Sequence, residues 1–321
     1  MKKIWVVIVT FNAGEKVVEC LKSLFHCKTG GLDHELKIVV VDNHSTDKSV
    51  EFIKKLTSSR VNRLKNKKIN SLITSKSTIK LIENKTNLGF AAASNIGIKK
   101  ALKSKADYIL LLNPDTTVKK NFLTPLLEVL KRPKAGICGP KILFESASNS
   151  KKPKIWSAGG RLDKKRFSGG LIGHGEEDQG QHDVKKSVDF ISGTCMLIKK
   201  QVFEKIGFLA EDYFLYYEDV DFCFQAGKVG YRVIYNPLSI IYHFGSFTIN
   251  KNSKIMQYYL ARNRLLFLSR YASLKIKIRE IIRLSKTIDE HLKNQQTWAI
   301  YGILDFFLRK RGMKNELHGK K

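Results

Sequence analysis

The sequence predicts an α/β protein with a Rossmann-like sheet and helices on both faces, and two features of the first 115 residues support this prediction. First, the apolar runs IWVVIV at 4–9 and KIVVVD at 37–42 are continuous, as expected for strands that are covered on both faces. Second, amphipathic stretches separate the apolar runs, so that strand and helix alternate in the order βαβαβαβ. This order is typical of a doubly wound domain.

The remaining elements of this pattern follow closely along the chain. We expect strands at 79–83 and 108–112, and helices at 14–25, 45–56, 91–102 and 121–130. Residues 145–187 are rich in Gly, Ser and Lys and are expected to form a mobile loop or hairpin over the site.

The composition is dominated by positive charge. The chain has 321 residues, with 58 Lys and Arg against 29 Asp and Glu, which leaves a formal net charge of +29. Such a charge favours nucleotides, nucleic acid or acidic lipid headgroups without choosing among them. No acidic residue lies between Glu51 and Glu83, where basic residues crowd. This segment is either a solvated insertion or an anion-binding surface.

Cysteine use and hydropathy indicate a cytoplasmic protein. The five cysteines form neither a CxxC pair nor a His/Cys cluster, so neither a zinc site nor a disulfide framework is predicted. The apolar run at 4–9 is too short for the core of a signal peptide, and no stretch approaches the roughly 20 apolar residues of a spanning helix. We expect a soluble protein or one that is peripheral on the inner face of the cell membrane.

Polar residues cluster where the predicted strands end, which is where open α/β sheets bind ligands. These residues are Thr10, Phe11 and Asn12, then Asp42, Asn43, Ser45 and Asp47, then Asn113 and Asp115. Asp and Asn also cap helices and form turns, and Asp47 is best explained as part of a helix start.

The sequence lacks the glycine-rich motifs that bind nucleotides through the backbone. Neither GxGxxG after the first strand nor GxxxxGK[ST] is present. The base of a bound nucleotide would therefore be recognised by side chains. Asp42 could accept a hydrogen bond from a pyrimidine N3–H and Phe11 could stack on the ring. A divalent cation, Mg²⁺ or Mn²⁺, would neutralise the diphosphate.

Asp115 is a candidate metal ligand, and His243 is the best candidate for a second one. Taken by itself, a histidine in such a strand is more often a hydrogen-bonded core residue. The densest acidic cluster, at 216–221, contains Glu218, Asp219 and Asp221. At a helix start, Glu218 and Asp221 share a face, so one of them is expected to cap the helix or form a salt bridge. Asp219 then points elsewhere and could act as the general base of sugar transfer. The alternative is a charged first turn that the helix dipole stabilises.

Six motifs in order resemble glycosyltransferase family 2, especially its rhamnosyltransferase-like members. They are VVIVTFN (6–12), VVVDNHSTD (39–47), NLGFAAASNIGI (87–98), LLLNPDTTV (110–118), the long segment from ISGTCMLIKK to GYRVIY (191–235) and HFGS (243–246). The resemblance covers about residues 4–270.

The resemblance implies a GT-A fold, inversion at the anomeric carbon and a role for each matching residue. The nucleoside side of the family's site is matched by Thr10, Phe11, Asn12, Asp42, Asn87 and Asn95. The diphosphate and metal motif falls on Asn113 and Asp115, and the late metal ligand on His243. The catalytic base falls on Asp219, and the sugar and acceptor cleft is matched by Trp156, Gly193 and Glu218. Asn113 replaces the first carboxylate of the metal motif, and Ala93 stands where relatives often have glycine.

The implied reaction transfers a sugar from a nucleotide-diphosphate donor, of the dTDP-rhamnose or UDP-hexose type, to a glycan or a lipid-linked acceptor in the synthesis of cell-surface polysaccharide. We expect a catalytic domain at 1–250, with a nucleotide-sugar half at 1–118 and an acceptor half at 119–250.

Residues 251–321 are expected to form a basic helical extension. They carry 17 Lys and Arg against 5 Asp and Glu, together with apolar helix faces. These faces could meet an anionic membrane surface. Alternatively, they could pack on the catalytic domain or on a second subunit of a homo-oligomer.

Three other functions compete with this prediction. A nucleotidyltransferase would carry a Gly-rich basic loop after the first strand, where this chain has Asn12-Ala13-Gly14-Glu15. A specific nucleic-acid binder would interleave aromatic and basic residues, yet the basic segment at 51–83 has only Phe52. A non-catalytic sugar-nucleotide binder would not need Asp115, Asp219 and His243.

Overall fold

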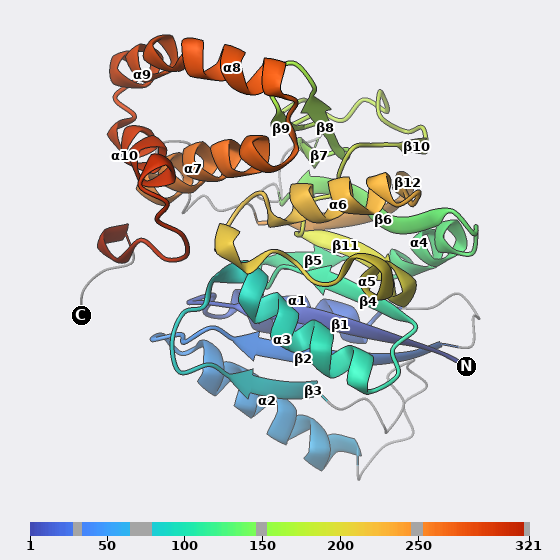
Figure 1. Ribbon diagram of the computed structural model, residues 1–321. Coiled ribbons are helices and arrows are strands. Elements are labelled where there is room, and N and C mark those ends of the chain that lie inside the picture. Colours follow the sequence, from blue (N-terminus) through green and yellow to red (C-terminus); the bar gives the residue numbers. More distant parts are fainter. Residues whose placement is uncertain (28–33, 65–78, 146–152, 245–252, 318–321) are drawn as a thin grey trace.

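The computed structural model of the chain (Figure 1) describes residues 1–27, 34–64, 79–145, 153–244 and 253–317. The predicted basic insertion between Glu51 and Glu83 falls largely outside these described residues, so its structural role stays a prediction.

The first third of the chain has the predicted alternation of strands and helices. Its elements are β1 (Lys2–Thr10), α1 (Lys16–Phe25), β2 (His34–Asp42), α2 (Ser49–Leu64), β3 (Ile79–Glu83), α3 (Gly89–Lys103) and β4 (Tyr108–Leu112). The strands β3 and β4 have the predicted bounds. Helix α2 begins four residues later than expected, because side chains at the ends of β1 and β2 bind the backbone of the loop before it: Thr46 N donates to Asn12 Oδ1 at 2.8 Å and Ser45 N donates to Asp42 Oδ2 at 3.0 Å.

The middle of the chain adds short strands and helices. They are β5 (Thr116–Val118), α4 (Leu123–Leu130), β6 (Ala135–Phe144), β7 (Ile155–Ser157), β8 (Gly160–Asp163), β9 (Ser168–Leu171), β10 (Lys186–Ser187), β11 (Cys195–Lys199), α5 (Lys200–Ile206), η1 (Glu211–Tyr213), α6 (Glu218–Lys228) and β12 (Arg232–His243). Strands β8 and β9 form the hairpin that was expected within 145–187.

One mixed sheet organises the molecule. Its strand order is β10-β12-β6-β11-β4-β1-β2-β3, with β5 beside β12 and β7 beside β6. Strands β4, β1, β2 and β3 are parallel, whereas β11 runs antiparallel to both of its neighbours. The mixed α/β prediction is confirmed.

Helices cover both faces of this sheet (Figure 1). Alternate β1 side chains enter different cores: Val6 and Ile8 pack with α1 and α4, while Val7 and Val9 pack with α3. Because both faces are buried, the central parts of β1 and β2 are apolar without interruption, which explains the continuous runs in the sequence.

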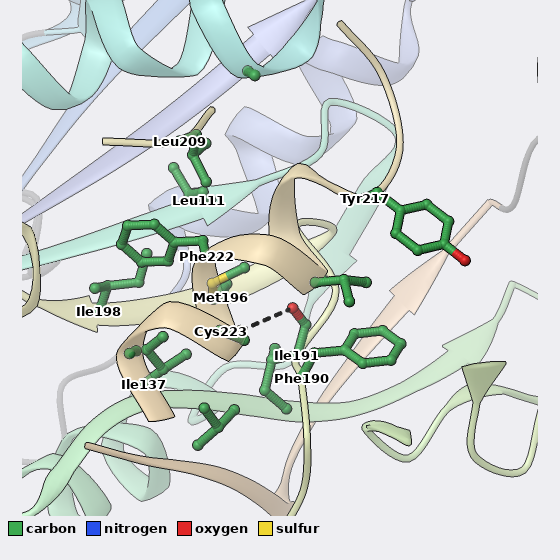
Figure 2. Close-up of a cluster of buried hydrophobic side chains, with 14 of the residues drawn as sticks. Leu111, Ile137, Phe190, Ile191, Met196, Ile198, Leu209, Tyr217, Phe222 and Cys223 are labelled. Carbon is green, nitrogen blue, oxygen red and sulfur yellow. Dashed lines mark hydrogen bonds between the residues drawn. The ribbon is translucent and has the colours of Figure 1, made fainter. Parts of the chain in front are cut away.

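Helix α6 packs against β11 and thereby fixes the acidic cluster at its own start. Figure 2 shows Phe222 and Cys223 of α6 among Met196 and Ile198 of β11 and Ile137 of β6. Phe222, Cys223 and Met196 are each at most 1% exposed. This packing leaves little freedom to the first turn of α6, where Glu218 and Asp219 lie.

Four helices follow the sheet: α7 (Lys254–Tyr271), α8 (Leu274–Ile282), α9 (Leu284–Lys293) and α10 (Thr297–Phe307), then the short η2 (Asn315–Leu317). Figure 1 shows α8 and α9 running above α7, with α10 beside α7. None of the helices in the described part of the chain has the length and apolar composition needed to cross a bilayer.

Helix α7 is an integral part of the structure. Arg262 and Asn263 are 1% and 0% exposed, and both donate hydrogen bonds to backbone carbonyls of the segment 212–216. The predicted boundary at residue 250 therefore separates two segments that pack closely together.

Candidate active site

Two polar side chains at the ends of β1 and β2 have unsatisfied oxygens. Asp42 is 3% exposed, and its Oδ2 accepts a hydrogen bond from Ser45 N at 3.0 Å. Asp42 Oδ1 and Thr10 Oγ1 are buried and have no hydrogen-bond partner among the described residues. A buried oxygen without a partner is costly, so this edge of the sheet is suited to a ligand N–H or O–H.

Phe11 and Asn12 follow β1 and have different surroundings. Phe11 is 41% exposed, which leaves its ring available for stacking. Asn12 adopts a left-handed backbone with φ of 51°, and its amide oxygen holds Thr46 N. Asp47 accepts from Ser49 N at 3.0 Å, which confirms its predicted place at a helix start, and also from Gly14 N at 2.9 Å.

The two asparagines around α3 have mainly internal partners. Asn87 Oδ1 accepts from Asn43 Nδ2 at 2.7 Å and from Gly89 N at 2.9 Å. Asn95 Nδ2 donates to Leu209 O at 2.9 Å and to Glu211 Oε1 at 2.8 Å. Both amide hydrogens of Asn95 are thus used to tie α3 to the segment that leads into the acidic cluster.

Asp115 and His243 lie side by side although 128 residues separate them. The pairing of β5 with β12 places His243 opposite Thr116, next to Asp115 in the chain. His243 Nε2 lies 3.1 Å from Asp115 Oδ1. Burial raises the pKa of Asp115, but the hydrogen bond and charge of His243 outweigh burial, so that the pKa is lowered overall.

These two side chains fit a divalent cation whose coordination is completed by a diphosphate. A carboxylate oxygen and an imidazole nitrogen in contact are suitable donors for Mn²⁺, and Mg²⁺ sites commonly combine one or two carboxylates with phosphate oxygens. His243 Nδ1 is buried with no partner among the described residues, and the edge of the Trp156 ring lies against the imidazole, with centroids 4.7 Å apart. No group of three potential ligands occurs in the part of the chain that the structure describes.

The segment before α6 has an unusual backbone. Phe214, Tyr216 and Tyr217 have φ values of 65°, 67° and 75°, a region that bulky L residues rarely adopt. Asn263 of α7 holds this segment, because its Nδ2 lies 2.9, 2.8 and 2.8 Å from the carbonyl oxygens of Tyr213, Leu215 and Tyr216. Backbone strain of this kind persists only where the surroundings enforce it, and it is concentrated at functional sites.

The three carboxylates of the acidic cluster have different surroundings. Asp221 is buried and accepts from Tyr213 Oη at 2.7 Å and Tyr271 Oη at 3.0 Å, and it pairs with Arg270. It is therefore the structural partner that the sequence predicted for this face of the helix.

Asp219 faces the cavity described below and keeps hydrogen bonds to its charged form. Its Oδ2 accepts from Gly193 N at 2.9 Å and its Oδ1 from Val220 N at 2.8 Å. Burial raises the pKa of Asp219, and these backbone donors limit the rise.

Glu218 is 4% exposed and its Oε2 has no partner among the described residues. Burial, and then the charge of Asp219, raise the pKa of Glu218 well above its usual value. The surroundings therefore disfavour the charged form of Glu218.

Six of the thirteen predicted site residues line a cavity of about 920 Å³. Its lining includes Asn113, Trp156, Gly193, Glu218, Asp219 and His243. Asp115 reaches this cavity through its contact with His243, while Thr10, Phe11, Asn12, Asp42, Asn87 and Asn95 lie outside its lining. The structure thus brings the candidate base and His243 to one cavity, and Asp115 contacts His243.

Two residues of this region had not been predicted from the sequence. Lys16, at the start of α1, is close enough for its charge to lower the pKa of Asp115, and its Nζ lies 5.7 Å from the centroid of the Phe244 ring. Its position just after β1 was a signal that could have identified it. Asn263 carried no such signal, because an asparagine in a basic amphipathic helix has no distinctive pattern.

The glycosyl transferase family 2 model matches residues 5–207, which is more than half of the chain. The chain belongs to this family. The matched range contains the candidate donor residues and Asp115, whereas Asp219 and His243 lie beyond it.

Curated relatives of this family 2 member are named as hexosyl- and rhamnosyltransferases. It is 31% identical over 154 residues to the low-salt glycan biosynthesis hexosyltransferase Agl10 of Haloferax volcanii, covering 47% of each chain. It is 27% identical to the dTDP-rhamnosyl transferase RfbF of Shigella flexneri, covering 61% of this chain and 65% of RfbF. The matches therefore span about half to two thirds of these relatives. The N-acetylglucosaminyl-diphospho-decaprenol L-rhamnosyltransferase of Mycobacterium tuberculosis is 24% identical, covering 74% of this chain and 75% of that protein.

Solved structures support the fold. GalNAc-T7 with UDP, GalNAc and Mn²⁺ superposes with a TM-score of 0.59 at 14% identity, covering 84% of this chain and 48% of that chain. The mannosyltransferase PcManGT of Pyrobaculum calidifontis with GDP-Man and Mn²⁺ gives 0.55 at 13% identity, covering 96% and 87%. The GT-A fold with a C-terminal helical region is thereby confirmed.

Proposed function

We propose that this glycosyltransferase inverts the anomeric carbon in a single displacement, with Asp219 as the general base. The observation that carries the proposal is the position of Asp219 in the cavity that His243 and Asn113 also line. A carboxylate that keeps two backbone hydrogen bonds remains ionised and can accept a proton.

The residues would divide the work as follows. The acceptor hydroxyl gives its proton to Asp219 as its oxygen forms a bond to the anomeric carbon, and the bond between that carbon and the diphosphate oxygen breaks. Gly193 N fixes the Asp219 carboxylate, because a donor at 2.9 Å restricts its rotation. Glu218, which is neutral, can donate a hydrogen bond to an acceptor oxygen.

Asp115 and His243 would hold Mg²⁺ or Mn²⁺ at the donor diphosphate. The bound cation would stabilise the negative charge that develops on the leaving nucleoside diphosphate. Lys16 would add a further positive charge on the same side, as its effect on the pKa of Asp115 indicates.

The donor is proposed to be a pyrimidine nucleotide sugar of the dTDP-rhamnose or UDP-hexose type. Asp42 supports this choice, since its buried and unpartnered Oδ1 can accept from the N3–H of thymine or uracil. Phe11 is exposed and can stack on the base. The acceptor would be a glycan or a lipid-linked sugar of a cell-surface polysaccharide.

The decisive experiment replaces the base without changing its shape. Asp219→Asn should lower kcat by at least about 100-fold, with donor affinity changed by less than about twofold, because only proton transfer is lost. Transfer would be measured by release of nucleoside diphosphate, after screening nucleotide sugars for Mn²⁺-dependent thermal stabilisation.

Glu218→Gln is the matched control, since it makes the same chemical change one residue away. The proposal predicts a loss of less than about tenfold for this variant. An Asp219→Asn protein that kept most of its transfer activity would exclude the base role.

We also propose that the outer surface of α8 and α9 meets an anionic membrane surface. Leu274, Ile278, Ile281, Ile282 and Leu292 are between 50% and 73% exposed, so these side chains do not pack on the catalytic domain. Basic residues such as Lys275, Lys277 and Arg283 alternate with them. Apolar side chains next to basic ones are typical of helices that lie in the headgroup region.

A further inference from the structure

The cavity that contains Asp219 extends well beyond the catalytic residues. From Asn113, His243 and Asp219 it continues without interruption to the space between α7, α9 and α10. We call this distant part the helical chamber. Its walls are formed by Leu260, Ala261 and Leu265 of α7, Leu284 of α9, and Ala299 and Ile303 of α10.

The helical chamber is not where the nucleotide would bind. The residues at the carboxyl ends of β1 and β2, Thr10 and Asp42, do not line the cavity. The donor's nucleoside would lie at that edge of the sheet, so only its sugar would reach the cavity. A volume of about 920 Å³ is near the upper end of the roughly 300–1,000 Å³ of small-molecule sites, which leaves space for an acceptor larger than one sugar.

The chamber walls determine which chemical class can fill that space. Leucine, isoleucine and alanine side chains offer no hydrogen bonds to the hydroxyl groups of a glycan. Two pairs of polar side chains at the chamber contact each other: Arg264 pairs with Glu280, and His291 Nδ1 lies 2.7 Å from Gln296 Oε1. The second carboxylate oxygen of Glu280, Oε1, has no partner among the described residues. A hydrocarbon chain gains most from such walls, because transfer of apolar surface out of water is favourable.

An ion pair fixes α8, which together with α9 forms the roof of the helical chamber. Arg264 of α7 donates to Glu280 of α8 and, at 2.8 Å, to the carbonyl oxygen of Arg166 in the turn between β8 and β9. Glu280 is 8% exposed, in contrast to the exposed apolar residues of α8 around it. Helix α8 therefore has a fixed position above α7, so that the chamber is a preformed space.

We infer that the helical chamber binds the hydrocarbon chain of a lipid-linked acceptor, with the acceptor's sugar held at Asp219. This inference rests on the proposed function and narrows its acceptor to the lipid-linked class. An isoprenoid or acyl chain enters between α7 and the α8–α9 roof, beside the outer surface proposed to meet the membrane. The sugar next to the chain then lies in the catalytic half, where Glu218 and Asp219 can contact its hydroxyl groups.

The test measures binding of isoprenoid phosphates to the full chain by calorimetry, below their critical micelle concentrations. Farnesyl phosphate should bind at least about 100-fold more tightly than isopentenyl phosphate, because its longer chain buries more methylene groups. Ala261→Trp, which fills the chamber, should weaken farnesyl phosphate binding by at least about tenfold and leave isopentenyl phosphate unchanged. Ala261→Leu should give an intermediate loss.

Two control variants separate the chamber from the protein's outer surface. Ser285→Trp adds the same ring to an exposed position of α9 outside the cavity lining, and Ile281→Ser removes an exposed apolar side chain of α8. Both should keep the affinity of the unmodified protein for farnesyl phosphate. Equal affinity for the two phosphates overturns the inference, as does farnesyl phosphate binding that survives in Ala261→Trp but is lost in Ile281→Ser.

The same preparations distinguish this inference from the proposed function. Stabilisation of each variant by a nucleoside diphosphate with Mn²⁺ verifies that it is folded and that the donor side is intact. Chain-dependent binding without any nucleotide binding would contradict the glycosyl-transfer mechanism and leave the chamber assignment standing. Nucleotide binding together with isoprenoid binding that does not depend on chain length would contradict the chamber assignment and leave the glycosyl-transfer mechanism standing.

Discussion

Glu218 and Asp219 are neighbours in the chain, yet their carboxylates have different surroundings. Glu218 is buried with an unpartnered oxygen, whereas Asp219 accepts two backbone hydrogen bonds. In a site of low polarity, two adjacent carboxyl groups that carry one negative charge between them have a lower free energy than two that are both ionised. The pair therefore offers an ionised base beside a neutral hydrogen-bond donor.

Glu218→Gln is expected to stabilise the protein at neutral and alkaline pH. The pKa of Glu218 is raised in the folded state, so its contribution to stability is present below the unfolded-state pKa of about 4.3 and is lost as pH rises through the folded-state pKa. The glutamine does not ionise and avoids this loss. The difference in Tm between variant and unmodified protein should be small near pH 4, increase with pH and then level off. A constant difference would show that Glu218 does not titrate as described.

The Asp219 carboxylate should be visible in the pH profile. Its pKa is raised by burial, and the deprotonated form is the one proposed to act, so kcat/KM should rise with pH through a pKa above the usual Asp value of about 3.9. Initial rates measured from about pH 4 to about pH 8 would show this rise on the acidic side of the profile. A rate that is flat down to the usual Asp pKa contradicts the assignment.

Asp115→Asn tests whether this single side chain is a metal ligand. An amide oxygen is a weaker ligand for Mg²⁺ or Mn²⁺ than a carboxylate, so the Mn²⁺ concentration for half-maximal activity should rise by about 10- to 100-fold. Addition of EDTA to the unmodified protein should abolish transfer. Asp289→Asn, on an exposed position of α9, is the control and should leave the Mn²⁺ requirement unchanged. Equal Mn²⁺ requirements in all three proteins would exclude Asp115 as a ligand.

At the scale of elements, α7 acts as a support for the strained segment before α6. Asn263 contacts three backbone carbonyls there and Arg262 contacts two. Helix α3 also supports this region, because Phe90 N donates to Phe214 O at 2.7 Å. Gly89 is required beside it, since a Cβ at this position would lie 2.5 Å from the same oxygen.

Asn263→Ala is expected to reduce turnover by at least about tenfold while preserving donor affinity, because the segment relaxes and moves Asp219. Loss of the buried amide also leaves carbonyls unsatisfied, which should lower the free energy of unfolding by about 1–3 kcal/mol. Kinetics and denaturant unfolding would measure the two effects. Asn294→Ala at an exposed position is the matched control. If Asn263→Ala lost stability but kept kcat, α7 would have no role in positioning the base.

At the scale of the whole molecule, the exposed apolar side chains of α8 and α9 lie outside the sheet and its covering helices. We propose a membrane surface as their partner, and a second copy of the chain is the alternative. The net charge of +29 favours the anionic membrane.

Sedimentation with anionic liposomes at low salt tests this partner. The protein should pellet with the liposomes, and Ile281→Ser combined with Ile282→Ser should move most of it to the supernatant. Raising the salt to about 1 M, where the Debye length is about 3 Å, should also release it. Leu238→Ser, at a 79% exposed position of β12, is the control. Unmodified protein that stays in the supernatant at low salt contradicts membrane binding, and a dimer in solution would then identify the second copy as the partner.

Much of the fold could be predicted because its signals are local. The continuous apolar runs identified β1 to β4, and the helical spacing identified α1 to α4, since periodicity depends only on neighbouring residues. The start of α2 was misplaced because hydrogen bonds from Asn12 and Asp42, which belong to other elements, hold the loop before it. Helical spacing predicted a structural role for one of Glu218 and Asp221, and only the structure assigned it to Asp221, whose partner Tyr271 lies 50 residues away.

The sequence by itself determined the α/β class, the parallel first half of the sheet, the family and a short set of candidate residues. Only the tertiary structure decided that His243 touches Asp115, that Glu218 is buried beside Asp219 with its pKa raised, that α7 enforces the backbone before α6, and that the cavity continues into an apolar chamber. The physical reason is that hydrophobic period and turn chemistry act between neighbours along the chain, whereas burial, pKa and cavity shape depend on segments that meet only when the sheet and its helices pack.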